Sequence, residues 1–275
     1  MIDERTQDEL RATARRIRRH LVQMSNRARA AHLGSALSCV DLLVYAYWRL
    51  LEVSPTDHAA PQRDRFLLSK GHAAAALYAT LAERGFFPVA ELQHFGEDGG
   101  SLSEQMSPGC VAGVEAATGS LGHGLPLGAG MALASRIVKC DFQVCVLMSD
   151  GECNEGSVWE AAMFAAAQQL SNLTVVVDYN GWQATGRSDD VLRLAPLADK
   201  WRAFGFETCE VDGHDFAAIE NAVADGSERT RPLAVVARTT KGRGVSFMED
   251  DNNWHYRIPN DTEVAAALAE LEQSS

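Results

Sequence analysis

The spacing of apolar residues predicts a helix at the start of the chain. Five of these residues recur every three or four positions and so share one helix face: Leu10, Ala14, Ile17, Leu21 and Met24. Ahead of them, Thr6 and Glu9 have the spacing of a capping box. We therefore expect an amphipathic helix over about the first 25 residues.

The next stretches predict buried elements and one long loop. Residues 39–51 are apolar on nearly every side, which predicts a buried helix that ends near Pro55. Residues 64–87 look strand-like and then helical. Residues 96–113 are polar and glycine-rich without periodicity, which predicts a long loop, and such loops are usually functional.

The second half of the chain alternates strands and helices. Valine-rich runs at 143–148, 174–179, 206–211 and 232–239 are separated by helical stretches at 157–169, 197–204 and 216–224. The strand-like runs lack polar alternation, as expected of a parallel sheet covered by helices on both faces. The pattern predicts a doubly wound α/β fold, and since no linker is visible, a single domain over residues 1–275.

Charge and composition exclude several functions. The net charge of −12 disfavours nucleic acid as a partner, no apolar run approaches a membrane span, and the amino terminus is acidic and polar, unlike a signal peptide. The six cysteines form no C-x-x-C pair, so we expect reduced thiols. We therefore expect a cytoplasmic protein that does not bind membranes.

Two polar residues follow neighbouring predicted strands. Asp150 comes after the strand at 143–148, and Asn180 comes after the strand at 174–179. In a right-handed βαβ unit both reach the carboxyl edge of the sheet, where α/β proteins bind ligands. A carboxylate and an amide oxygen suit magnesium bridged to a diphosphate. The alternative, that both residues only cap turns, has about equal weight on spacing alone.

Glycines and histidines give weaker signals. Five glycines in residues 117–130 precede an alanine-rich helix, where they could bring backbone close to a ligand or serve helix packing alone. Four histidines lie in turn-like contexts: His32, His72, His123 and His255. Singly, each is more often an ordinary surface or hydrogen-bonded histidine. Together they lack zinc-ligand spacing, but they could converge on a phosphate or a sugar hydroxyl.

Long motifs give a specific resemblance. The segments concerned are AHLGSALS, DRFLLSKGH, GVEAATGSLGHGL, SDGECNEGSVWEA, VVDYNGWQATG, LADKWRAFGFETCEVDGHD and TTKGRGVSFMEDDNNWH. They resemble the amino-terminal half of transketolase, and more closely the separate amino-terminal subunit of split, two-gene transketolases. The resemblance extends from about residue 10 to 270.

The resemblance implies a site for thiamine diphosphate. It assigns magnesium to Asp150, Asn180 and the backbone carbonyl of Trp182. It also assigns contacts with the cofactor to seven residues, of which Asn180 is a magnesium ligand as well. They are His72, Gly119, Leu121, Gly151, Glu155, Asn180 and His255. Within this set Gly119 and Leu121 would line the thiazolium, and Glu155 would reach across a subunit interface. It also makes His32 and His255 the substrate-facing histidines that hydrogen-bond the ketose and help to move protons.

The sequence departs from the family pattern at informative places. Ser149 replaces the first glycine of G-D-G, Ser35 replaces the last glycine of G-H-P-G-G, and Tyr256 replaces the glycine of W-H-G. The donor-contacting histidine of a G-H-P segment before G-V-E is missing, and Glu104 or Gln105 stands in its region. Cofactor residues are therefore better preserved than substrate residues.

The resemblance implies transfer of a two-carbon ketol unit from a ketose phosphate to an aldose phosphate. The glutamate that activates the cofactor lies in the family's other half, so we expect an α2β2 heterotetramer with a carboxyl-terminal partner subunit. One alternative is a specialised C2 transferase with an unusual aldehyde or a carrier-bound lipoyl acceptor. Another is a catalytically degenerate scaffold subunit.

Overall fold

A parallel sheet forms the centre of the structure. The computed structural model describes residues 2–223 and 229–273, and within these ranges the sheet has five strands in the order β1-β2-β3-β5-β4, each paired in parallel with its neighbours. The strands are β1 (Arg65–Leu68), β2 (Val144–Ser149), β3 (Leu173–Tyr179), β4 (Glu207–Asp212) and β5 (Leu233–Arg238).

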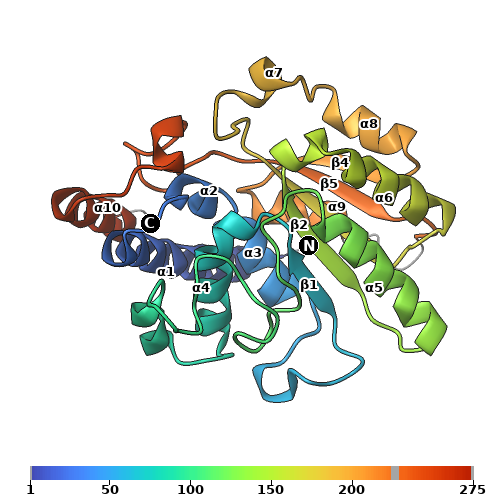
Figure 1. Cartoon of the computed structure of the whole chain (residues 1–275), viewed down its shortest axis with the longest axis horizontal. Helices are drawn as coiled ribbons and strands as arrows, with labels where there is room; N and C mark the ends of the chain where they lie inside the picture. The colour runs from blue at the N-terminus through green and yellow to red at the C-terminus, as the bar shows by residue number, and fades with distance from the viewer. Residues whose placement is uncertain (1, 224–228, 274–275) are drawn as a thin grey trace.

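Helices cover both faces of this sheet (Figure 1). One hydrophobic core includes residues of α1 (Glu4–Ala28), α2 (Leu33–Ser38), α3 (Val40–Tyr45), α4 (Ala74–Arg84), α9 (Phe216–Val223) and α10 (Asp261–Gln273). The other lies under α5 (Gly124–Val138), α6 (Gly156–Ala167) and α8 (Leu197–Ala203). A one-turn helix, α7 (Ser188–Val191), precedes α8. The predicted doubly wound α/β fold is confirmed.

The two cores explain why the strands lack polar alternation. Along β2, Cys145 and Leu147 belong to the first core, whereas Val144, Val146 and Met148 belong to the second. Because side chains of a strand alternate between its two faces, a strand between two apolar layers must be apolar at every position. All six residues of β2 are accordingly buried.

From residue 143 onward the expected strands and helices agree with the observed ones to within about two residues at each end, but the order of the last strands was not predicted. The strand expected at 232–239 is β5, and it lies between β3 and β4 rather than at the edge. The helix expected at 216–224 is α9, although residue 224 lies outside the described residues. The loop at 96–113 contains neither helix nor strand, as predicted.

The predicted capping box at Thr6 and Glu9 is wrong. Helix α1 begins at Glu4, and its N-cap is Asp3, whose carboxylate accepts a hydrogen bond from the backbone N–H of Thr6 at 2.8 Å. Thr6 is therefore inside the first turn, and the side chain of Glu9 accepts from Arg5 instead. An aspartate at the N-cap satisfies a backbone donor of the first turn, as the threonine was expected to do.

The expected helix at 39–51 is divided. Cys39 separates α2 from α3, and α3 continues as a π-helical turn over Ala46–Leu50, after which Leu51 is extended. All residues of α2 and α3 are buried, as predicted for this apolar stretch. The division turns α2 toward the carboxyl edge of the sheet, where Ser35 and Ser38 hydrogen-bond residues described below.

No helix in the described ranges has both the length and the apolar character needed to cross a membrane. All six cysteines have free thiols.

A buried ion pair joins the long first helix to the core. Arg18 of α1 donates from Nη1 and Nη2 to the two carboxylate oxygens of Asp41 in α3, at 3.0 and 2.7 Å. His214 contacts the same carboxylate through Nδ1 at 2.6 Å. Burial alone would raise the pKa of Asp41, but Arg18 and His214 outweigh it and hold the pKa well below its usual range.

Replacing Asp41 with leucine should therefore lower the free energy of unfolding by about 3–5 kcal/mol, because it leaves the Arg18 charge buried without a partner. The double variant Arg18→Met/Asp41→Leu should recover most of that loss. Urea unfolding of the full chain measures both. Equal losses of unfolding free energy in the single and double variants would show that the unpaired charge of Arg18 is not the cause.

The same pair predicts a pH dependence. A carboxyl whose pKa is depressed on folding stabilises the protein above its unfolded pKa, here 3.8, and this contribution is lost as the pH falls toward the folded pKa. Below about pH 4, the free energy of unfolding of the wild type should thus fall more than that of the double variant.

Candidate active site

The structure brings Asp150 and Asn180 together at the carboxyl edge of the sheet. Asp150 follows β2 and Asn180 follows β3, and these strands are neighbours. The backbone N–H of Gly181, next to Asn180, donates to Oδ2 of Asp150 at 3.0 Å. The sequence prediction that these two residues share one edge is therefore confirmed.

Asp150 is a fully buried carboxylate. It accepts hydrogen bonds from the backbone N–H of Gly151 at 2.8 Å, from Gly181 and from the hydroxyl of Ser188 at 2.8 Å. No lysine, arginine or histidine among the described residues forms an ion pair with it. Burial raises the pKa of Asp150 to about 6, and the nearby Asp178 carboxylate adds to the shift. A bound cation would compensate this charge.

The neighbouring oxygens suit a hard divalent cation. Oδ1 of Asn180 faces the next loop, where it accepts from the backbone N–H of Trp182 at 3.0 Å. One carboxylate, one amide oxygen and the main-chain carbonyl of Trp182 make an all-oxygen donor set, with ligand phosphates left to complete an octahedron. In the described ranges no group of three or more His, Cys, Asp and Glu side chains could hold a metal, which agrees with a set that contains only one such residue.

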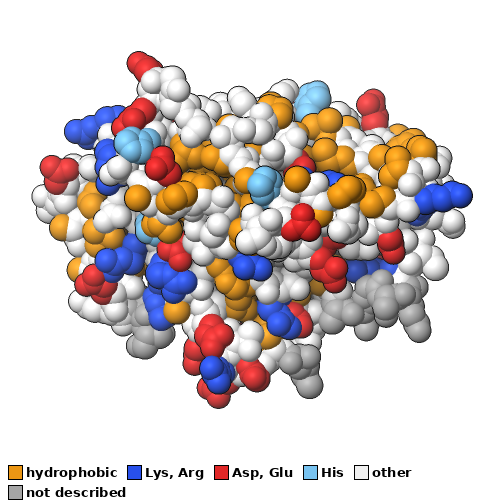
Figure 2. All heavy atoms as spheres, turned by 90° about the horizontal axis from the view of Figure 1, so that it is seen from below, with side chains coloured by type: hydrophobic (Ala, Val, Ile, Leu, Met, Phe, Trp, Pro, Cys, Tyr) orange, Lys and Arg blue, Asp and Glu red, His pale blue; other side chains and the backbone are white. Residues whose placement is uncertain are grey.

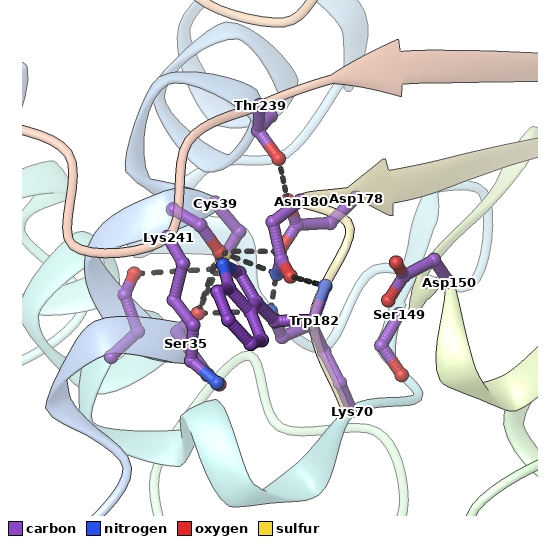
Figure 3. A network of polar contacts seen from close by, with 12 residues as sticks. Ser35, Cys39, Lys70, Ser149, Asp150, Asp178, Asn180, Trp182, Thr239 and Lys241 are labelled. Carbon is purple, nitrogen blue, oxygen red and sulfur yellow. Dashed lines mark hydrogen bonds and ion pairs between the residues drawn. The ribbon is translucent and has the colours of Figure 1, made fainter. Parts of the chain in front are cut away.

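A second buried charge pair lies beside this edge (Figure 3). Lys70, which follows β1, donates from Nζ to Oδ2 of Asp178 and to the carbonyl of Ser35 at 2.9 Å. Asp178 also accepts from Ser38 at 2.6 Å and from Thr239. Burial alone would lower the pKa of Lys70, but Asp178 outweighs it and raises the pKa to about 12.

Sequence reasoning missed this pair. Both residues lie within quoted motifs, Lys70 in DRFLLSKGH and Asp178 in VVDYNGWQATG. The signal that could have found them is a single charged residue at the end of an otherwise apolar strand, because such a charge must be buried and therefore paired.

Three of the four histidines singled out from the sequence converge. The ring centroids of His32 and His72 are 5.4 Å apart, those of His32 and His255 5.1 Å, and those of His72 and His255 5.9 Å. His123 is not among them, because it is exposed and contacts Ser120 and the carbonyl of Leu121.

The surroundings of the three converging imidazoles favour the neutral ring, because the pKa of each lies below its ordinary value. Burial is the main cause that lowers the pKa of each ring, and the Lys70 and Lys241 ammonium groups add to it. The pKa of His72 lies well below its ordinary value, and that of His255 falls to about 3. Within the described residues, the rings of His32 and His72 form no hydrogen bond. His32 also has a left-handed backbone, φ 69°, which is strained for a residue with a Cβ.

The glycine-rich segment packs against Gly71, the residue before His72 of the histidine cluster. A Cβ on Gly71 would lie 2.5 Å from the carbonyl carbon of Thr118, so only glycine permits this approach. Gly119 has φ 136°, a conformation that favours glycine. The hydroxyl of Thr118 is buried with no hydrogen-bond partner in the structure, as expected of a group that awaits a ligand. These features fit a bound cofactor.

The glycine segment is held in place by a buried residue that sequence reasoning missed. Glu152 accepts from the backbone N–H groups of Gly122 at 3.0 Å and Ser149 at 2.8 Å, and from the hydroxyl of Ser69. Ser69 in turn accepts from the N–H of Gly124 at 3.1 Å. This fixes Gly122 and Gly124 at the start of α5.

The remaining candidates from the sequence lie around this segment. Leu121 is half-buried, and Gly151 begins a short 3-10 helix directly after Asp150. Glu155 is exposed at the N-cap of α6 beside Gly122, and its carboxylate has no hydrogen-bond or ion-pair partner among the described residues.

Glu104 and Gln105, the two residues in the region of the missing histidine, have different neighbours in the structure. Glu104 lines a small pocket together with His32 and His72. Gln105 instead covers Gly119, since a Cβ added there would collide with its side-chain Oε1. The two side chains thus face different parts of the site.

Comparisons with known proteins agree with this geometry. Residues 10–272 match the family described as transketolase, thiamine diphosphate binding domain. The chain is 39% identical to one subunit of an apulose-4-phosphate transketolase from Actinobacillus succinogenes, covering 96% of both chains. It is 36% identical to a 6-deoxy-6-sulfo-D-fructose transketolase subunit of a Clostridium species, covering 97% of this chain and 98% of the relative.

A solved transketolase from Leishmania mexicana has the same fold, with a TM-score of 0.90 and 24% identity. The match covers 96% of this chain but 41% of that longer one. The family match over residues 10–272 and the relatives above 30% identity show that the chain belongs to the transketolase family, as its thiamine diphosphate-binding domain. Among transketolases it is similar along nearly its whole length to proteins named as separate subunits, as the motif resemblance predicted.

The assignment of Asp150 as a cation ligand predicts a specific defect. Asp150→Asn removes the charge and keeps one acceptor oxygen, which can serve Gly151 or Gly181 but not both, so thiamine diphosphate affinity in the presence of magnesium should fall more than about tenfold. Titration calorimetry measures this. The control is Asp141→Asn, an exposed aspartate just before β2 at the opposite end of the strand. Unchanged cofactor affinity and magnesium dependence in the folded Asp150 variant would contradict the assignment.

Proposed function

We propose that the chain is the amino-terminal subunit of a transketolase that moves a two-carbon ketol unit from a ketose phosphate to an aldose phosphate. The observation that carries the proposal is the set of three neutral histidines, His32, His72 and His255, gathered beside the glycine-rich segment. Imidazoles with free ring nitrogens are suited to hydrogen-bond the several hydroxyls of a sugar.

In this proposal the sheet edge holds the cofactor. Asp150, Asn180 and the carbonyl of Trp182 bind magnesium, while His72 and the backbone at Gly151 contact the diphosphate. Gly119 and Leu121 line the thiazolium. When bound, thiamine diphosphate supplies the electron sink that lets a carbon–carbon bond beside a carbonyl break. His32 and His255 orient the ketose through its hydroxyls.

The relatives support an anionic sugar as substrate. Their names describe a sugar phosphate in one case and a sulfonated sugar in the other. The Lys70 and Lys241 charges lie beside the histidine cluster and lower the pKa of its rings, so they would also attract an anionic substrate.

We also propose that a partner subunit covers one side of the molecule. Helices α5 and α6 pack together and expose large apolar side chains: Leu127, Ile137, Val138, Met163 and Phe164. Figure 2, which views the molecule from below Figure 1, shows hydrophobic side chains gathered along the upper part of the picture and charged groups more frequent below. Exposed apolar surface of this kind marks protein interfaces. Glu155 is the N-cap of α6, so it would meet the partner at the cofactor end of this surface.

The chain alone should therefore show no turnover with saturating thiamine diphosphate and magnesium, because the residue that activates the cofactor would come from the partner. Activity on ketose phosphates should appear when a carboxyl-terminal transketolase subunit is added, and the complex should have the mass of an α2β2 heterotetramer. Conversion of xylulose 5-phosphate by the pure chain would rule out this division of labour. Failure of the complex to bind thiamine diphosphate would instead favour a scaffold subunit.

A specialised C2 transferase is the second candidate, and the loop at Glu104 and Gln105 favours it. A carboxylate beside His32 and His72 would repel a phosphate, while the carboxamide over Gly119 is a neutral donor with a different reach from imidazole. A site built to pair particular hydroxyls discriminates strongly against substrates that leave its polar groups unpaired.

Substitution of these residues should change the choice of donor. In the reconstituted complex, Gln105→Ala and Glu104→Ala should each change the ratio of kcat/KM between two ketose donors by about tenfold, on the scale of one buried hydrogen bond. Steady-state kinetics on xylulose 5-phosphate and other ketoses, with aldose phosphate and carrier-bound acceptors, measures this. If the wild type and both variants had the kcat/KM of an ordinary transketolase on pentose phosphates, the replacement of the missing histidine by Glu104 and Gln105 would have no functional meaning.

A further inference from the structure

Lys241 forms a buried contact with one of the site histidines. Its side chain comes from the segment after β5, is fully buried, and places Nζ 2.9 Å from Nδ1 of His255 and 2.6 Å from Oδ1 of Asn252. His255 and Asn252 both lie on the short 3-10 helix Asn252–His255. Figure 3 shows Lys241 extending beside Ser35 and Lys70 within this polar network.

The direction of these hydrogen bonds is fixed by chemistry. An ammonium group has donors and no acceptor, so Nδ1 of His255 must accept and cannot carry a proton. The amide of Asn252 is oriented independently, because its Nδ2 donates to the carbonyl of Ala184 at 3.1 Å and leaves Oδ1 for Lys241. A neutral His255 with an accepting Nδ1 must have its proton on Nε2.

The charge states favour this arrangement. Burial, Lys241 and His32 lower the pKa of His255 to about 3, so the ring is neutral. Burial and the Lys70 charge lower the pKa of Lys241 to about 8, which leaves it an ammonium at neutral pH.

The backbone beside Lys241 is held by His214, the ring that also contacts the ion pair between Arg18 of α1 and Asp41 of α3. The N–H of Thr240 donates to Nε2 of His214 at 2.9 Å, and Nδ1 of the same ring contacts Asp41. The N–H of Gly242 donates to the carbonyl of Gly34 at 2.9 Å. Lys241 is therefore placed by contacts on both of its sequence neighbours.

We propose that Lys241 is a positioning residue that holds His255 as its Nε2–H tautomer, so that this histidine presents a hydrogen-bond donor to the substrate. Nε2 of His255 has no partner among the described residues, and its ring lies against those of His32 and His72. The inference rests on the proposed function for the identity of the acceptor, a hydroxyl or carbonyl oxygen of a ketose. It makes His255 a fixed donor rather than a general base.

Long-range 1H–15N NMR of the full chain with 15N-labelled histidine reads the tautomer directly, and the His255→Gln variant assigns the signals. At pH 7 the wild type should show His255 protonated at Nε2 alone. Lys241→Met should give a mixture of both tautomers, whereas Lys241→Arg, which keeps a donor without an acceptor, should retain the Nε2–H form. Lys200→Met, which removes a lysine of α8, is the matched control and should leave the signals unchanged.

An Nδ1–H tautomer or an imidazolium in the wild type would overturn the inference, as would an unchanged tautomer in a folded Lys241→Met. The wild-type spectrum decides the first point even if that variant does not fold. The measurement needs no turnover, so it is separable from the proposed function. A correct tautomer in a complex without transketolase activity would reject the proposed function and leave the role of Lys241 intact.

Discussion

The buried ion pair between Lys70 and Asp178 organises the carboxyl edge of the sheet. It joins the end of β1 to the end of β3, and through Ser35, Ser38 and Thr239 it also joins α2 and the end of β5. Two charges without exposure can persist there only because nearly every lone pair and proton has a partner. Consequently, four separate elements of the chain are fixed relative to one another at the point where the ligand groups project.

The sequence was sufficient for those parts of the fold that depend on local pattern. The apolar runs of β2 and β3 and the position of Asp150 and Asn180 at their ends follow from periodicity and from the geometry of a βαβ crossover. The order of β4 and β5 does not follow, because it depends on the long-range packing of α8 and α9 and not on any local signal. The start of α1 was misplaced for a related reason, since Asp3, Thr6 and Glu9 all satisfy local capping rules and only the chain's actual path selects among them.

The site could be predicted in part for the same reasons. Motifs identified the histidines, but nothing in their spacing shows that His32, His72 and His255 meet while His123 turns outward. Glu152 and Lys241 escaped notice because their roles consist of hydrogen bonds to residues distant in sequence, and a lone charged residue in a loop usually indicates a solvated surface. The resemblance offered Glu104 or Gln105 for the region of the missing histidine, and only the packing of the loop assigns the two side chains to different neighbours.

The choice of lysines rather than histidines as the charged groups of the site has an electrostatic consequence. The chain is acidic overall, with a net charge of −12, so at long range it repels anions. Close to the site, Lys70 and Lys241 are ammonium groups at neutral pH and burial lowers the pKa of all three imidazoles, so the positive charge there comes from lysines. The site group that mild acidification would neutralise is Asp150, whose pKa burial raises to about 6. Capture of the proposed anionic sugar would therefore depend on ionic strength, which screens the outer repulsion far more than the buried attraction.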